Sequence, residues 1–386
     1  MLRLRPLATG MEKTEKLLSE LIALPSVNPA FRPAGDSQAG EKRVADFLAT
    51  VAAQAGLEIE FQNVLPGRAN LIARLSPPGK IRQRLLLAPH LDTVPAATEN
   101  QFTPLRKNGR LAGRGACDTK GSVAAMLAAL CELANSTSRP QATEIIFAGL
   151  VDEENAQAGS RALAASGLKA DLAIVGEPTR LKVVTAHKGS LWLKLATRGK
   201  AAHGARPDLG RNAVHSMARI VDTLETEYAA LLRRRRHPLL GHATVNTGMI
   251  HGGTQPNIVP DACTLSIDRR TLPGETEAGV RREITTLLAR KKLQVKFGRA
   301  KLLPALPLET KASLPLVRQF MRCALQPRPA GVDYFCDASV LAGAGIPSVV
   351  FGPGDIAQAH TADEWISLAS LRSAKEILLR LFRSLP

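Results

Sequence analysis

The sequence predicts an α/β protein in which a mainly parallel sheet is sandwiched by helices and interrupted by a smaller α+β domain. In the first and last parts of the chain, near-continuous apolar segments alternate with helical segments, which is typical of a parallel sheet covered on both faces. From about residue 187 the pattern changes to strands of alternating polarity. The length of 386 residues is sufficient for two or three domains.

The first part of the chain predicts buried strands separated by helices. The apolar strands are RLLLAP, TEIIFAGLV and DLAIVG, at residues 84–89, 143–151 and 171–176. The helices are a small-residue segment at 122–133 and a segment at 158–166 that stops at Gly167. Ligand and catalytic residues of such sheets lie beyond the carboxyl ends of the strands. The polar residues that follow these strands are therefore the candidates for chemistry.

The middle of the chain has the strand–helix–strand–strand–helix–strand order of a ferredoxin-like unit. Its predicted elements are 190–197, 211–232, 243–251, 261–270, 276–290 and 293–297. After Pro307 the first pattern resumes, with a helix at 314–325, a strand at 348–351 and a helix at 367–382. We therefore predict one catalytic domain made of residues 1–186 and 299–386, with a second domain, 187–298, inserted into it.

Composition excludes several classes of protein. With 45% hydrophobic and 22% charged residues, the chain is globular rather than disordered. The net charge of +17 could indicate a nucleic-acid partner, and residues 187–298 hold 19 basic and 9 acidic side chains. However, only Arg233–Arg236 forms a dense basic block, and just 4% of residues are aromatic, so stacking platforms for single strands are scarce. We expect no nucleic-acid partner.

The sequence also predicts a cytoplasmic protein. No apolar run approaches the ~18 residues of a membrane span, so we expect no membrane partner. The N-terminal segment MLRLRPLATGMEK has no apolar core, which argues against a secretory signal. The five cysteines are scattered and form no Cys-x-x-Cys pair, which favours a reducing compartment over a disulfide framework or a thiolate zinc site.

Metal-ligating side chains follow the predicted strands or lie in adjoining loops. They are His90, Asp118, Glu153, Glu154, Glu177 and His360. Two histidines with three or four carboxylates suit two zinc-like ions that share one bridging carboxylate. Two such ions ~3.5–4 Å apart activate water at neutral pH and polarise a carbonyl. A single histidine after a strand is more often structural, so the prediction depends on the pattern recurring at several strand ends.

The motifs that hold these residues resemble a known family. They are HLDTVP, GRGACDTKG, VDEEN, GEPT, AAHGARPDLGRNA, GGTQPNIVPD, DRRTLPGET and GPGDIAQAHTADEW. In combination they resemble the di-zinc amidohydrolases that include acetylornithine deacetylase, succinyl-diaminopimelate desuccinylase, aminoacylase and carboxypeptidase G, over nearly the whole chain from about Leu17. The resemblance implies a zinc-peptidase α/β domain with an inserted ferredoxin-like lid, and a homodimer formed through that lid.

The resemblance also implies the roles of the ligands. Asp118 would bridge two divalent ions, zinc or alternatively cobalt or manganese. His90 and Glu177 would complete one site, and Glu154 and His360 the other. His187 and His251 also lie near strand ends, but the AQAHTADEW context favours His360 as the second histidine.

Two neighbouring acidic residues are expected to act differently. By resemblance, Glu153 would be the general base that takes a proton from water and gives it to the leaving amine. The alternative for Glu153 and Glu154 is a solvated acidic pair at a helix start. Asp92 would accept the spare imidazole N–H of His90, or alternatively form a turn. The resemblance further implies a cis peptide bond after Asp118.

The remaining candidates would contact the substrate. By resemblance, His203 would reach the neighbouring subunit's site and stabilise the oxyanion, and Asn257 would bind substrate. Arg270 would pair with a substrate carboxylate, with Arg269 as the competing choice because strand alternation lets only one face the site. Gly352 and Gly354 would let backbone amides approach that carboxylate, or simply form a turn.

The resemblance implies a metal-dependent hydrolase that cleaves an amide bond in an N-acyl amino acid or small peptide. Because the GPGDIAQAHTADEW stretch most resembles acetylornithine deacetylases, N-acetyl-L-ornithine is the lead substrate. A glutamate-releasing carboxypeptidase or a succinyl-diaminopimelate desuccinylase is the nearest alternative, and the basic inserted domain suits anionic substrates. A non-catalytic dimeric or nucleic-acid-binding protein on the same scaffold would be expected to lose metal ligands, and none is missing. A serine or cysteine hydrolase is disfavoured because the chain has no Gly-x-Ser-x-Gly elbow and Cys117 lacks an evident base.

Overall fold

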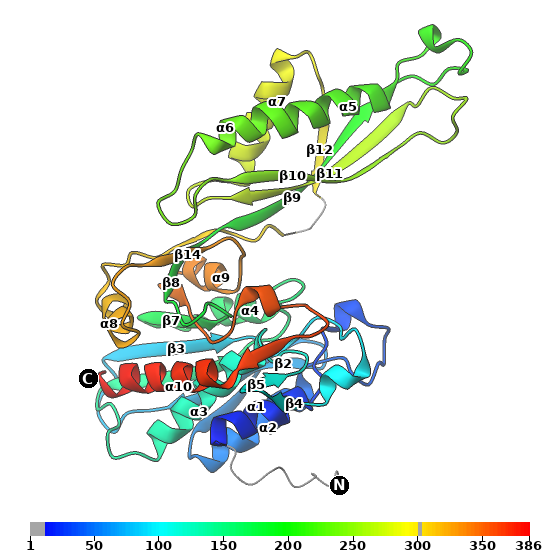
Figure 1. Ribbon diagram of the computed structural model, residues 1–386. Coiled ribbons are helices and arrows are strands. Elements are labelled where there is room, and N and C mark those ends of the chain that lie inside the picture. The colour runs from blue at the N-terminus through cyan, green and yellow to red at the C-terminus, as the bar shows by residue number, and fades with distance from the viewer. Residues whose placement is uncertain (1–11, 300–302) are drawn as a thin grey trace. The chain divides into compact units, whose positions relative to one another are not determined.

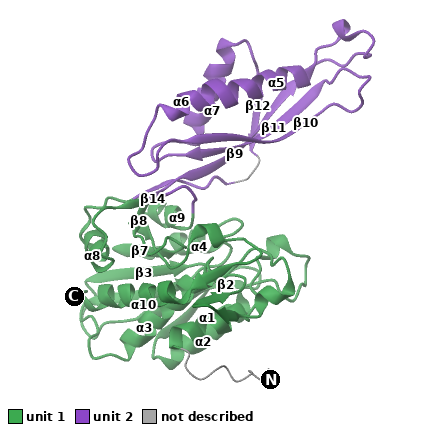
Figure 2. Ribbon diagram, in the orientation of Figure 1, with its two compact units in different colours: residues 1–185, 310–330, 336–386 green, residues 186–309, 331–335 purple. Residues whose placement is uncertain are grey.

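The computed structural model describes residues 12–299 and 303–386, which form two compact units (Figure 2). Unit 1 contains residues 1–185, 310–330 and 336–386, and unit 2 contains residues 186–309 and 331–335. The N-terminal residues 1–11, which hold most of the segment expected to lack a secretory signal, lie outside the described part.

The sheet of unit 1 has a parallel centre and antiparallel edges (Figure 1). Its strands are β1 (Glu58–Leu65), β2 (Arg68–Leu75), β3 (Gln83–Pro89), β6 (Thr143–Gly149), β7 (Leu172–Gly176), β8 (Val184–His187) and β15 (Ser348–Val350), in the order β1-β2-β6-β3-β7-β15-β8. The four strands β6, β3, β7 and β15 run parallel. Every residue of β6 and β7 is buried, as expected for strands covered on both faces.

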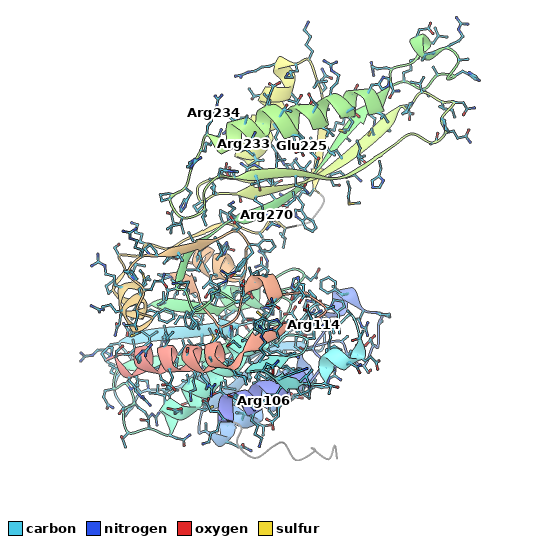
Figure 3. The ribbon with its side chains drawn as sticks, in the orientation of Figure 1. Arg106, Arg114, Glu225, Arg233, Arg234 and Arg270 are labelled. Atoms are coloured by element: carbon cyan, nitrogen blue, oxygen red, sulfur yellow. The ribbon has the colours of Figure 1, made fainter. Side chains whose placement is uncertain are left out.

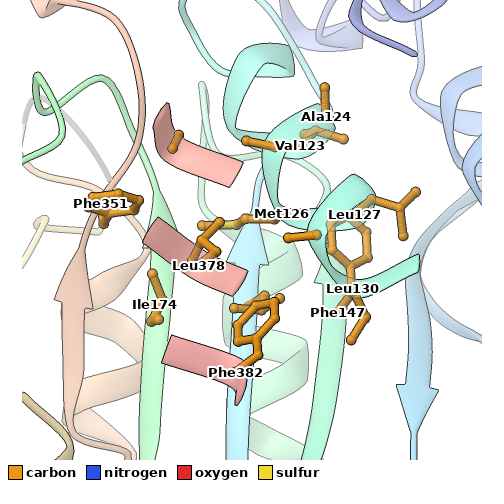
Figure 4. Packing of buried hydrophobic residues seen from close by; sticks show 14 of the residues in the cluster. Val123, Ala124, Met126, Leu127, Leu130, Phe147, Ile174, Phe351, Leu378 and Phe382 are labelled. Atoms are coloured by element: carbon orange, nitrogen blue, oxygen red, sulfur yellow. The ribbon is translucent and has the colours of Figure 1, made fainter. Parts of the chain in front are cut away.

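Helices cover both faces of this sheet (Figure 1). One face carries α1 (Lys13–Ile22), α2 (Lys42–Gln54), α3 (Lys120–Ala134), α8 (Pro315–Cys323) and α10 (Leu368–Arg383), whose apolar side chains share one cluster with the strands. Figure 4 shows Met126 of α3 beside Leu378 of α10 in this cluster. On the other side α4 (Ala158–Ala165) packs against α9 (Ala338–Gly343). The predicted fold class is thereby confirmed.

Smaller elements complete unit 1. A three-stranded sheet is formed by β4 (Leu105–Lys107), β5 (Arg110–Ala112) and β16 (Trp365–Ser367). Short 3₁₀ turns occur at Pro29–Phe31, Glu99–Phe102 and Ile356–Gln358. Two further strands pair with β8: β13 (Leu308–Glu309), which belongs to unit 2, and β14 (Ala330–Val332), of which only Ala330 belongs to unit 1.

Unit 2 is a four-stranded antiparallel sheet with helices on one face (Figure 1). Its elements are β9 (Gly189–Arg198), a 3₁₀ turn (Pro207–Leu209), α5 (Ala213–Thr223), a π-turn (Leu224–Tyr228), α6 (Ala229–Arg233), β10 (Thr244–Gly252), β11 (Ala262–Thr271), α7 (Glu277–Arg290) and β12 (Lys296–Arg299). The strand order β10-β11-β9-β12 is that of the expected ferredoxin-like unit. The helix predicted at 211–232 corresponds to one continuous helical segment, residues 213–233, in which Leu224–Tyr228 are π-helical.

The chain enters and leaves unit 2 through neighbouring strand segments. His187 in β8 pairs with Leu308 in β13, and the backbone groups of Ser190 and Ala305 exchange two hydrogen bonds of 2.9 Å. Within the described ranges, no helix has the length and apolar character required to cross a membrane.

Candidate functional site

The parallel strands of unit 1 bring the candidate ligands to one edge of the sheet. His90 directly follows β3, Glu177 directly follows β7, and Glu154 lies in the loop after β6. His360 lies in the loop after β15, and Asp118 precedes α3. Because β6, β3, β7 and β15 are neighbours that run in the same direction, their carboxyl ends place these segments side by side.

One group of donor atoms consists of His90, Asp118 and Glu177, all buried. Nε2 of His90 lies 3.1 Å from Oδ1 of Asp118 and 3.9 Å from Oε1 of Glu177. The donor atoms of the group all lie within 4.8 Å of one another. Three convergent imidazole and carboxylate donors are the usual protein contribution to a catalytic zinc site.

A second group shares Asp118 and adds Glu154 and His360. Nε2 of His360 lies 3.2 Å from Oδ2 of Asp118 and 3.3 Å from Oε1 of Glu154. The two oxygens of Asp118 therefore face different imidazoles, which is the arrangement that a bridging carboxylate requires. The peptide bond between Asp118 and Thr119 is cis, as the resemblance implies.

The buried carboxylate of Asp92 organises the loop after β6. Oδ1 accepts a hydrogen bond from the backbone N–H of Glu153, and Oδ2 accepts one from that of Glu154, both at 3.1 Å. Nδ1 of His90 lies 2.9 Å from the main-chain oxygen of Asp92 and 3.4 Å from its Oδ1. Glu153 itself belongs to neither donor group.

The electrostatics of the site favour cations. Burial raises the pKa of Glu177 well above its usual value, and the charge of Asp118 raises it further. Burial and the charge of Glu177 likewise raise the pKa of Glu153. Hydrogen bonds with Asp118 and Glu154 raise the pKa of His360 to about 10. Carboxylates crowded together in a low-dielectric site repel one another, and divalent cations relieve that repulsion.

The donor set fits two divalent metal ions. It supplies two imidazoles and three carboxylates, one of them shared, which are ligand types that suit zinc, cobalt and manganese. Neither His187 nor His251 belongs to these groups. His187 is buried with Nδ1 against the main-chain oxygen of Lys188, and His251 is an exposed residue of β10.

Unit 2 holds the two competing arginines on opposite faces of its sheet. Arg269 is fully buried under the helices, where it donates to the hydroxyl of Tyr228 and pairs with Glu275 at 2.6 Å. Arg270, labelled in Figure 3, is partly exposed and pairs with Asp268 at 2.9 Å. Of the two guanidinium groups, only that of Arg270 is therefore accessible from outside the core of unit 2.

His203 and Asn257 lie on adjacent exposed loops of unit 2. His203 bridges to Ile258, and the N–H of Gly204 donates to the main-chain oxygen of Asn257 at 2.7 Å. Both side chains are exposed. They lie at the end of the sheet where β9 finishes, whereas Arg270 pairs with Ser190 near the start of β9.

The two glycines of the GPG segment are packing positions. A Cβ on Gly352 would lie 2.2 Å from Oγ of Ser122, and one on Gly354 would lie 2.6 Å from Sγ of Cys117. Their N–H groups donate within the chain, from Gly352 to Thr179 at 3.1 Å and from Gly354 to Ser370 at 3.3 Å. Contact of these amides with a substrate stays a prediction.

Several polar residues around Asp92, most of them buried, were not predicted from the sequence. Nδ2 of Asn28 donates to Asp92 at 2.7 Å and to Asp152 at 3.0 Å. Asp152 also pairs with Arg68 at 3.0 Å, and Arg68 is held by Glu41. Asp152 stands beside Glu153 in a motif that was recognised, but Asn28, Arg68 and Glu41 carry no local signal in the sequence.

Comparisons with known proteins agree with this geometry. A family model described as peptidase family M20/M25/M40 matches residues 86–384. The acetylornithine deacetylase of Myxococcus xanthus is 32% identical over 379 residues, which cover 94% of this chain and 95% of the relative. The acetylornithine deacetylase of Edwardsiella ictaluri is 33% identical over 378 residues, covering 95% and 96% of the two chains.

Solved structures show the same fold at lower identity. The aminopeptidase PepT from Bacillus cereus has a TM-score of 0.78 and 22% identity, and the match covers 96% of this chain and 97% of that one. The YXEP protein of Bacillus subtilis, described as a dinuclear metal-binding peptidase of the M20 family, has a TM-score of 0.70 and 15% identity, with 96% of both chains covered.

Proposed function

Because this chain belongs to the peptidase family M20/M25/M40 and is a metal-dependent amide hydrolase, we propose that it removes the acyl group from an N-acyl amino acid, with N-acetyl-L-ornithine as the lead substrate. The observation that supports amide hydrolysis is the convergence of five imidazole and carboxylate side chains, of which Asp118 is shared by the two donor groups. The choice of substrate is supported by relatives named acetylornithine deacetylase that align over nearly the full chain.

We propose two zinc ions as the resident metals, one held by His90, Asp118 and Glu177 and the other by Asp118, Glu154 and His360. When bound, such ions supply Lewis-acid polarisation of the acyl carbonyl and lower the pKa of water. The protein's own contribution is to fix the donors on rigid strand ends, so that little reorganisation is needed during the reaction.

Glu153 is the proposed general base. It would take a proton from the attacking water and deliver it to the nitrogen of the leaving amine. Two features support this role: its carboxyl group is outside both donor groups, and Asp92 fixes its backbone through a hydrogen bond.

Unit 2 is proposed to form a homodimer. Its edge strand β10 exposes Met249 and Ile250, which are 58% and 50% accessible. An exposed apolar edge strand presents unpaired backbone groups to a second copy. β9 spans ten residues, so the loop with His203 lies ~30 Å along the strand from Gly189, where the chain enters this sheet. We propose that His203 stabilises the oxyanion in the site of the second copy.

Asn257 and Arg270 are proposed to bind the substrate, with the guanidinium of Arg270 directed at its carboxylate. A cytoplasmic location is likewise proposed, and it is supported by the five cysteines, all of them unpaired in the described structure.

The substrate is tested with a panel of N-acetyl, N-succinyl and peptidyl amino acids, each assayed with added zinc or cobalt. We expect N-acetyl-L-ornithine to give the highest kcat/KM, because the relatives that align over the full chain carry that name. Chelation should abolish the activity and zinc should restore it. A preference for N-succinyl or glutamyl substrates would replace the proposed substrate with the anionic alternative, which the 19 basic side chains of residues 187–298 would suit.

A further inference from the structure

The segment that carries His360 ends in a glutamate that none of the roles above uses. Glu364 is 1% accessible and stands immediately before β16. Its carboxylate accepts four hydrogen bonds, all from residues 114–118. Oε2 accepts from Nη1 of Arg114 at 2.6 Å and from the N–H of Gly115 at 3.0 Å. Oε1 accepts from the N–H groups of Cys117 at 2.8 Å and of Asp118 at 3.0 Å.

The same two segments are joined by further bonds. The N–H of Gly113 donates to the main-chain oxygen of Glu364 at 3.0 Å. Nη2 of Arg114 donates to the main-chain oxygen of Thr361 at 3.2 Å. Figure 3 labels Arg114 in unit 1, beside the segment that leads into β16. One buried carboxylate thus connects the loop of Asp118 to the loop of His360.

A carboxylate is the side chain that this position requires. Its two oxygens are acceptors only, and the site presents three backbone N–H groups and a guanidinium, which are donors only. A buried N–H group without an acceptor costs free energy, so all four donors depend on residue 364. Arg114 balances the charge of Glu364, since both side chains are buried.

Resting on the proposed ligand set, we propose that Glu364 is a positioning residue for the metal centre: it fixes Asp118 relative to His360 and so sets the ion site that these two residues share with Glu154. Of the five proposed ligands, His360 has the most exposed side chain, so its position depends most on the surrounding backbone. Its side chain is 51% accessible and its φ of 63° lies in the left-handed region, which is unfavourable for residues other than glycine.

The test compares Glu364→Gln with the wild-type protein. Glutamine has nearly the same size, but its amide group turns one acceptor into a donor that faces other donors. By calorimetric titration with Co²⁺, we expect the wild-type protein to bind two ions and the variant to bind one of them about 10- to 100-fold less tightly. The Co²⁺ absorption bands of that ion should change as well.

Two further variants separate positioning from general stability. Glu15→Gln removes an equally buried carboxylate, 1% accessible, whose partners Arg106 and Arg372 lie outside the metal centre. It should lower the unfolding temperature without changing Co²⁺ affinity. Glu364→Asp keeps the charge but is one methylene shorter, so it should restore part of the lost affinity. It also replaces Glu364→Gln if that variant does not fold.

Amide hydrogen exchange of the ion-free protein provides a readout that needs no metal. In Glu364→Gln, peptides covering residues 113–119 should exchange roughly tenfold faster than in the wild-type protein. Wild-type Co²⁺ affinity and spectrum in Glu364→Gln would overturn the positioning role, and so would an equal affinity loss in Glu15→Gln. If the wild-type protein binds no ions while Glu364→Gln still exchanges faster, the proposed metal site is refuted. The link that Glu364 makes between the two loops is then still supported.

Discussion

At the scale of single residues, Asp92 connects parts of the site that are distant in sequence. Its carboxylate accepts hydrogen bonds from the backbones of Glu153 and Glu154 and from the side chain of Asn28. The sequence predicted that Asp92 accepts the spare N–H of the His90 imidazole, and Nδ1 of His90 lies 2.9 Å from the main-chain oxygen and 3.4 Å from Oδ1 of Asp92. The hydrogen bonds to the loop after β6 could not be predicted, because they depend on which strand ends become neighbours.

Replacing Glu153 tests whether Glu153 is the general base and the adjacent Glu154 the metal ligand. Glu153→Gln should lower kcat about 10²- to 10⁴-fold, since the amide cannot accept the proton, while both metal ions stay bound. Elemental analysis alongside steady-state kinetics checks this. Glu154→Gln is the matched control, and it should lose metal together with activity. Loss of metal in Glu153→Gln alone would show that the two assignments are reversed.

The candidate ligands were predictable because their chemistry and their positions coincide. His90 and Glu177 are metal-ligating side chains placed directly after buried strands, and both features can be recognised in the sequence. Glu364 and Arg114 stand inside motifs that were recognised, yet nothing in those motifs shows that they contact each other. Asn28 is isolated in sequence, and only its burial beside Asp92 reveals it.

At the scale of elements, the sequence predicted the central buried strands, but it predicted none of the elements before β3, although α2 has 13 residues and β2 is largely buried. The apolar runs at 84–89 and 143–151 correspond to β3 and β6. The strand β1 is mostly exposed, and β4, β5 and β16 have three residues each. Three residues are too few to display a period, and β16 finds its partner β5 only through tertiary structure.

His187 in β8 should make stability depend on pH. It is fully buried and its Nε2 has no hydrogen-bond partner among the described residues. Burial lowers its pKa to about 4 from the usual 6.5. The unfolded chain therefore gains a proton below about pH 6.5 while the folded protein does not, so stability falls as pH drops from 6.5 towards 4. This group alone should cost about 2–3 kcal/mol at pH 4.5.

Urea unfolding of the ion-free protein at pH 7 and pH 4.5 measures this effect. His187→Gln does not titrate in this range, so its free energy of unfolding should fall by about 2–3 kcal/mol less than that of the wild-type protein. His242, which is half-buried and likewise bonded to a main-chain oxygen, provides the control through His242→Gln. Equal losses in wild type and His187→Gln would mean that His187 accepts a proton in the folded state.

At the scale of the whole molecule, the proposed metal ligands and the proposed substrate-contacting residues belong to different units. All five candidate ligands and Glu153 belong to unit 1, whereas His203, Asn257 and Arg270 belong to unit 2. The fold class and the inserted character of unit 2 followed from the change in pattern near residue 187. That His203 acts in a second copy is implied by the resemblance alone, because no pattern in the residues indicates how two chains would assemble.

Mixed dimers test whether His203 acts in the second copy. Glu153→Gln and His203→Ala chains are co-expressed with different tags, and the heterodimer is isolated. If His203 serves the partner, one of the two sites regains both residues, and the heterodimer should show about half of the wild-type kcat per dimer. Heterodimer activity no higher than the mean of the two homodimers would place His203 in its own chain's site.

The paired segments at Ser190 and Ala305 bring the two ends of residues 191–304 next to each other. Because these residues already bond to each other, a tight turn could join them after residues 191–304 are excised, without stretching the backbone of the host. Such a truncated chain would keep every candidate donor to the metals. The host scaffold could therefore exchange one insertion for another over evolution, and acquire new substrates, while its inorganic centre stayed the same.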